Sequence, residues 1–110
     1  MKANNATTWI PRAQRFPIHA PLRYCIRGEK QWREGILENI SITGLLFKGA
    51  FLVERNTSIE LNIVLPARPA NAQGARIVCQ GTILRSWTCS GVPPMAMMAA
   101  AITHTRLVRP

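Results

Sequence analysis

Apolar residues stand at every second position in several short segments of this chain, and that period restricts the fold to β-structure more than any other feature. In Ile59–Leu65, for example, isoleucine and leucine alternate with Glu60 and Asn62. Glycine, proline and asparagine, which favour turns, separate the segments. The expected strands are Leu22–Arg27, Trp32–Ile40, Leu45–Lys48, Ile59–Leu65, Ala75–Thr88 and Met95–Thr105. Short strands at this spacing predict an all-β fold, either a small antiparallel barrel or a sandwich.

Two of these strands carry additional signals. Gly81, inside the fifth segment, predicts a bend or bulge where the sheet curls. The last segment is rich in methionine and alanine, which favour helix by intrinsic propensity. We assign it as a strand, because Gly91, Pro93 and Pro94 bound it and the sheet needs one more partner to close.

The length of 110 residues suits one domain with a single core. Residues Met1–Trp9 are polar and lack periodicity, so we expect a mobile N-terminal arm followed by one domain over residues 10–110. Prolines punctuate Pro11–Pro21 and predict an extended basic loop without a paired central strand. Pro66–Gly74 is expected to be a surface loop.

The charge of the chain is strongly positive. Fourteen Lys and Arg residues face five Glu and no Asp, which gives a net charge of +9. A surface of this kind attracts anions over long range, although the charge can also serve solubility alone. We therefore expect an anionic partner.

Several functional classes lack support in the sequence. Asp is absent and His19 and His104 lie far apart, so we expect neither an enzyme nor a bound metal or cofactor. The three cysteines have no CxxC spacing and are expected to be free thiols, at least partly buried. No segment has the length of a signal peptide core or a membrane span, so we expect a cytoplasmic protein without membrane insertion.

The stretch Asn39-Ile40-Ser41-Ile42-Thr43-Gly44 holds more hydrogen-bonding groups than a tight turn needs. We expect Gly44 to take a positive φ there, and we expect Asn39 and Ser41 either to cap the turn or to face a ligand. Arg12 and Arg15 offer guanidinium groups that can converge on one anion. A nucleotide with phosphates and guanines needs both kinds of group.

These residues resemble the PilZ family, small β-barrel receptors for the bacterial second messenger cyclic di-GMP. The family signature is an RxxxR loop followed by (D/N)xSxxG, and Asn39–Gly44 matches the second part without a gap. The stretch Arg15–Tyr24 resembles the family's approach to its first strand, and Gly81–Leu84 and Met98–Ile102 resemble its fifth and closing strands. The resemblance implies a six-stranded antiparallel barrel. It also implies a cyclic di-GMP site made by Arg12, Arg15, Asn39, Ser41 and Gly44.

The arginine loop departs from the family pattern. If Arg15 is the second arginine, the first should stand at position 11, which is proline, and Arg12 follows one residue late. A competing frame makes Arg15 the first arginine and puts His19 in the second place. We prefer the first frame, because the downstream match fixes Arg15.

The sequence leaves three functions open. The first is a cyclic di-GMP-binding regulatory module, of full or weakened affinity, that acts through a separate effector protein. The second is a PilZ-like adaptor that binds a protein partner without nucleotide, which Pro11 favours. The third is a basic barrel for RNA or DNA. We do not expect nucleic acid, because no strand displays the paired aromatic residues that stack bases.

Overall fold

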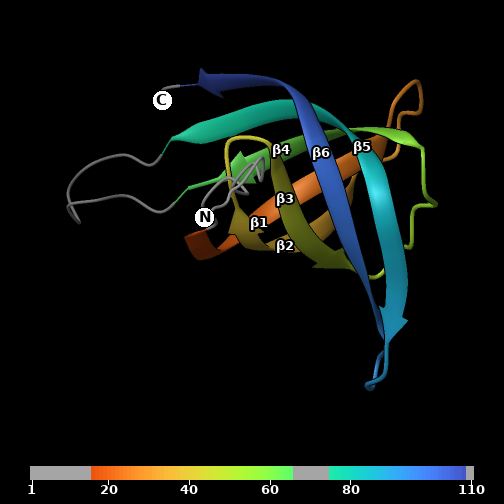
Figure 1. The fold of residues 1–110 in the computed structure, drawn as a ribbon. Helices are drawn as coiled ribbons and strands as arrows, with labels where there is room; N and C mark the ends of the chain where they lie inside the picture. The colour runs from red at the N-terminus through yellow and green to blue at the C-terminus, as the bar shows by residue number, and fades with distance from the viewer. Residues whose placement is uncertain (1–15, 66–74, 109–110) are drawn as a thin grey trace, which may run out of the picture.

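The computed structural model describes residues 16–65 and 75–108, and in these residues six strands form one closed antiparallel barrel (Figure 1). Its strands are β1 (Phe16–Ile26), β2 (Arg33–Ile40), β3 (Gly44–Gly49), β4 (Ser58–Val64), β5 (Arg76–Cys89) and β6 (Met95–Val108). Their order around the barrel is β1-β2-β3-β6-β5-β4. The all-β prediction is confirmed, and so is the strand assignment of the methionine-rich segment.

The alternation in the sequence places one side of each strand in a common core. In β4, Ile59, Leu61 and Ile63 are fully buried while their neighbours are at least partly exposed. The largest fully buried side chains of the described residues are Tyr24, Phe47, Leu37, Leu45, Ile59, Leu61, Ile63, Ile83, Met98, Val53 and Cys79. Burial of this apolar surface is the main favourable contribution to the stability of the barrel.

Tyr24 connects β1 to the chain that follows β3. Its hydroxyl donates to the Phe51 carbonyl at 2.7 Å and accepts from the Phe51 amide at 3.2 Å. Its ring meets that of Phe47 edge to face, with 5.1 Å between the ring centroids. Burial raises the pKa of the Tyr24 hydroxyl, so this hydrogen-bonded group stays neutral.

Strand β1 begins earlier than the prolines predict. Pro17 and Pro21, expected in a loop, pair with Asn39 and Ile36 of β2. The pairing of β1 with β4 starts only at Leu22, so the first half of β1 has β2 as its one neighbour among the described residues. A strand paired on one side tolerates proline, because one edge needs no amide donor.

Two further sequence predictions concern segments outside the described residues, the arm Met1–Trp9 and the loop Pro66–Gly74. Within the described residues, the predicted bulge at Gly81 is confirmed, since the register of β5 against β6 shifts between Gln80 and Gly81. The three cysteines are free, with Cys25 and Cys79 buried and Cys89 half-buried, as predicted.

The prediction that Gly44 takes a positive φ is wrong. Among the described glycines only Gly28 and Gly91 have positive φ, whereas Gly44 lies in β3 opposite Ala101 of β6. Its missing side chain serves a different purpose, because a Cβ at Gly44 would lie 2.9 Å from the Ala100 carbonyl oxygen. Gly44 therefore permits the close approach of β3 and β6.

We expect Gly44→Ala to destabilise the barrel. Its Cβ would force the β6 backbone outward, which should cost about 1–3 kcal/mol of unfolding free energy and lower the Tm by several degrees. Thermal unfolding followed by circular dichroism measures this effect. The matched control is Ile42→Ala in the same turn, where the side chain is 88% exposed and the expected change is within about 0.5 kcal/mol. Equal melting temperatures for the two variants would contradict the assigned role of Gly44.

Candidate functional site

The turn between β2 and β3 is held together by Ser41. The Ser41 amide donates to the Gly44 carbonyl at 2.8 Å, and the Ser41 hydroxyl also donates to that carbonyl at 3.3 Å. The same hydroxyl accepts from the amides of Thr43 and Gly44, at 3.3 and 3.2 Å. A serine hydroxyl has one proton and two lone pairs, so the turn itself uses its whole hydrogen-bonding capacity.

Burial agrees with this structural role. Ser41 is 7% exposed, so its polar side chain is buried. A buried hydroxyl without partners would be costly. The turn-capping alternative for Ser41 is therefore realised, and a ligand would reach this hydroxyl only by replacing one of its local bonds.

Asn39 lies where β2 meets the start of β1. Its Cα pairs with Pro17 on β1 and with Leu46 on β3, next to a register shift between Leu37 and Asn39. The side chain is half-buried. Phe16, the first residue of β1, pairs with Ile40. The chain thus runs into the barrel alongside the first residues of the Asn39–Gly44 motif.

Arg12 and Arg15 lie outside the described residues. Arg15 is the residue bonded to Phe16, so the arginine segment joins the barrel at the end of β2. His19, the alternative to a second arginine, belongs to β1 and its side chain is 72% exposed.

A charged cluster beside Asn39 was not predicted from the sequence. Glu38 lies 3.5 Å from the Lys48 ammonium nitrogen and 3.6 Å from Nε2 of His19. These three residues come from β2, β3 and β1. The positive charge of Lys48 offsets the negative charge of Glu38. Glu38 therefore repels an anion bound next to the motif less strongly. Pairing across strands brings the group together, and no local sequence signal could have shown it.

An apolar hollow of about 300 Å³ adjoins the turn. It is lined by Ser41 and by side chains from three strands and the turn, namely Ile40, Ile42, Ile77, Ile102 and Thr105. Ile42 is 88% exposed. A surface of this kind suits the flat face of a ring better than a phosphate, because it supplies apolar contact and few charges.

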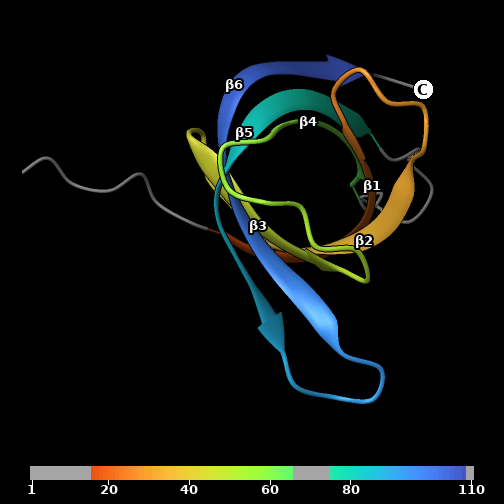
Figure 2. The same cartoon turned by 90° about the vertical axis from the view of Figure 1, so that its right-hand side faces the viewer.

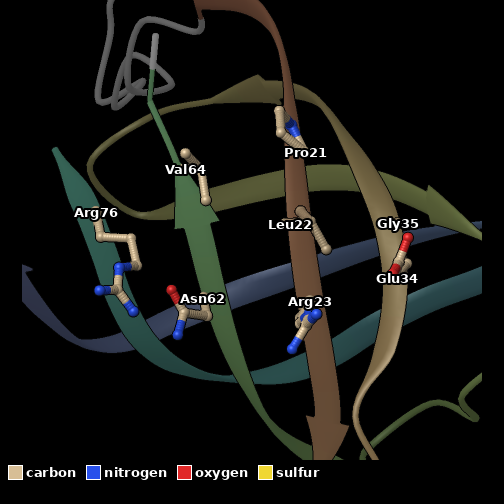
Figure 3. Close-up of a pocket in the computed structure, with 8 residues that line it drawn as sticks. All are labelled: Pro21, Leu22, Arg23, Glu34, Gly35, Asn62, Val64 and Arg76. Atoms are coloured by element: carbon tan, nitrogen blue, oxygen red, sulfur yellow. The ribbon is translucent and has the colours of Figure 1, made fainter. Parts of the chain in front are cut away.

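A second hollow, of about 400 Å³, lies on the outside of β1, β2, β4 and β5 (Figure 3). Asn62 lies between Arg76 on β5 and Arg23 on β1, and Glu34 is on β2 beyond Arg23. Among the described residues, neither guanidinium group has an ion pair, and the buried Oδ1 of Asn62 has no hydrogen-bond partner. The sequence showed these arginines only as part of the overall charge.

The described residues contain no group of three or more His, Cys, Asp or Glu side chains placed to hold a metal ion. In the same residues, no helix has the length and apolar character required to span a membrane. Burial raises the pKa of the Cys79 thiol to about 11, and it also raises the pKa of Cys25. Neither thiol is therefore suited to act as a nucleophile near neutral pH.

Comparison with known proteins identifies a shared fold. No protein-family model matches this chain, and neither does any curated protein sequence. Among solved structures, the Bacillus subtilis inhibitor of motility, MotI/DgrA, matches with a TM-score of 0.70 at 16% sequence identity. The match covers 96% of this chain and 49% of that protein, so the chain spans about half of its length. The barrel described above is thus a fold that also occurs in this inhibitor of motility.

Proposed function

We propose that this barrel is a regulatory module that binds cyclic di-GMP beside the β2–β3 turn. The observation that carries the proposal is the pairing of Phe16 with Ile40 and of Pro17 with Asn39. This pairing joins the segment that contains Arg12 and Arg15 to the end of the strand that bears the motif. Arginines and amide groups of the required chemistry therefore belong to adjoining parts of the chain.

The chemistry of cyclic di-GMP suits these groups. Its two phosphates call for guanidinium groups, and arginine binds phosphate oxygens with paired hydrogen bonds. Its guanine edges call for acceptors such as the Asn39 carboxamide oxygen. The isoleucine-lined hollow beside Ser41 offers apolar contact for the face of one base.

The motif residues divide into two roles in this proposal. Arg12, Arg15 and Asn39 contact the ligand directly. Ser41 and Gly44 set the shape of the turn, because the hydroxyl of Ser41 holds it closed and Gly44 admits the β6 backbone. Ligand contact accounts for the guanidinium and amide groups, and the shape of the turn accounts for the serine and the glycine.

A regulatory function also agrees with the structural comparison. The protein that shares the fold is named for inhibition of motility, which is a regulatory effect. We propose that this chain likewise works by binding, without catalysis, and passes its state to a separate effector protein. A cytoplasmic location fits this proposal, because the family that the sequence resembles binds cyclic di-GMP, which is an intracellular messenger.

Calorimetric titration tests nucleotide binding directly. We expect saturable heat with cyclic di-GMP at moderate salt, and much weaker heat with GTP or with random RNA at the same concentrations. The absence of heat from cyclic di-GMP at protein concentrations up to about a millimolar would contradict the proposal, because binding worth roughly 4 kcal/mol is detectable there.

The adaptor function without nucleotide is the second candidate, and Pro11 in place of the expected arginine favours it. Pro11→Arg separates the two candidates. If the natural chain binds no cyclic di-GMP and this variant binds it strongly, the natural protein is an adaptor. If both bind, the shifted Arg12 already fulfils the role of the first arginine.

We expect Arg15→Ala to weaken cyclic di-GMP binding by at least about tenfold, because a lost charge-assisted hydrogen bond costs about 1.5–3 kcal/mol. The Tm should stay almost unchanged, since Arg15 precedes the first strand. Arg27→Ala is the matched control, because it removes the same charge from an exposed position beyond the other end of β1. Equal losses of affinity would indicate a general charge effect, and a fall in Tm of many degrees would make Arg15 structural.

A further inference from the structure

The β5–β6 hairpin extends beyond the ring of the barrel (Figure 2). Both strands have 14 residues, whereas β3 has 6 and β4 has 7. The pairing of β4 with β5 ends at Thr82, and the loop before β4 adds hydrogen bonds only to Ile83. The pairing of β3 with β6 ends at Ala96. Among residues 16–65 and 75–108, the outer part of the hairpin therefore has no neighbouring strand on the β5 side.

Residues Leu84–Cys89 form this open edge of β5, which we name the β5 edge. From Arg85 to Cys89 they pair with β6, and no described residue pairs with their other side. Open edges expose unpaired backbone groups, and proteins commonly protect them with proline, lysine or bulges. The β5 edge contains no proline or lysine, and its bulge lies at the start, between Ile83 and Arg85. It is therefore competent to pair with another strand.

The side chains of the β5 edge suit a protein interface. Trp87 is 37% exposed and Leu84 is 51% exposed, and the half-buried Met97 pairs with Trp87 across the hairpin. The Arg85 guanidinium carbon lies 5.2 Å from the centre of the Trp87 ring. Arginine and tryptophan dominate the binding energy of many interfaces, and a cation over an aromatic ring adds to it.

The charge of this region selects the partner. Arg85 is the one charged residue of the β5 edge, and β5 and β6 contain no Asp or Glu. The loop beside the start of the edge adds Glu54 and Arg55, which cancel each other. The net charge beside a strand added to the β5 edge is therefore positive. A second copy of this chain is a poor occupant, because each copy carries +9.

We propose that the β5 edge binds an extended, acidic segment of another protein by strand addition. Backbone hydrogen bonds to the open edge supply affinity, and side-chain contacts supply specificity. Arg85 pairs with a carboxylate of the incoming strand, while Trp87 and Leu84 contact its apolar residues. The β5 edge pairs with Met95–Ala99 from one side of β6, whereas Gly44 of β3 pairs with Ala101 from the other side. The strand β6 therefore lies between the β5 edge and the β2–β3 turn.

Synthetic peptides as long as the β5 edge test the proposal without nucleotide present. One set alternates valine or threonine with glutamate, and a second set replaces glutamate with lysine. We expect fluorescence polarisation to show binding of the acidic set only. We expect Arg85→Glu to weaken that binding by at least about tenfold and to create binding of the basic set.

Arg106→Glu is the matched control, because Arg106 is an exposed arginine on β6 that pairs with Val78, far from the hairpin tip. It should leave acidic-peptide binding within about twofold of the natural chain. Both variants should keep the natural Tm, since both side chains are exposed. A bound peptide should also slow alkylation of Cys89, the last residue of the edge.

Three results would overturn this proposal. The first is that acidic and basic peptides bind alike, or that neither binds. The second is an equal loss of binding for Arg85→Glu and Arg106→Glu, which would indicate unspecific attraction. The third is a dimer in light scattering that Arg85→Glu disrupts, which would make a second copy the occupant. None of these results depends on whether cyclic di-GMP binds.

Discussion

The barrel depends on the close contact between β3 and β6, which are far apart in sequence. Gly44 permits it, because any side chain there would press on the Ala100 carbonyl oxygen. The Thr43 carbonyl continues the contact by accepting from the Ile102 amide at 2.9 Å. Ser41 shapes the turn that delivers Gly44 to this position. Bringing such distant strands together costs chain entropy, so a precise turn at the junction favours closure.

The sequence predicted the strands well because the period of two is a local signal, and Ile59, Leu61 and Ile63 are all buried as that period requires. It placed the start of β1 too late, because proline signals a loop unless the neighbouring strands are known. It assigned Gly44 a positive φ for a similar reason. A glycine in a predicted turn is readily assigned a positive φ from its neighbours in the sequence. The close approach of Ala100 to Gly44 is known only from the three-dimensional structure.

The candidate site shows the same limit. The sequence singled out Asn39 and Ser41. In the structure Ser41 is buried and bonds within its own turn, a role that the sequence already offered as the alternative to ligand contact. The ion pair of Glu38 with Lys48 and the hollow between Arg23 and Arg76 were not predictable. The ion pair depends on the register of β2 against β3, and the hollow depends on the closure of β4 onto β1, which are not consecutive in the chain.

The two proposed sites lie on opposite sides of β6, with the start of β3 paired at Ala101 and the β5 edge paired at Met95–Ala99. The central claim is that cyclic di-GMP binds at the first of these. The most direct test is to record which backbone amide signals shift in NMR spectra as this nucleotide is added. We predict shifts at Arg15 and across Asn39–Gly44, with the signals of the β5 edge unchanged. The account would be contradicted if only the signals of other residues shifted, or if the signals of Asn39–Gly44 did not shift at a saturating concentration of the nucleotide.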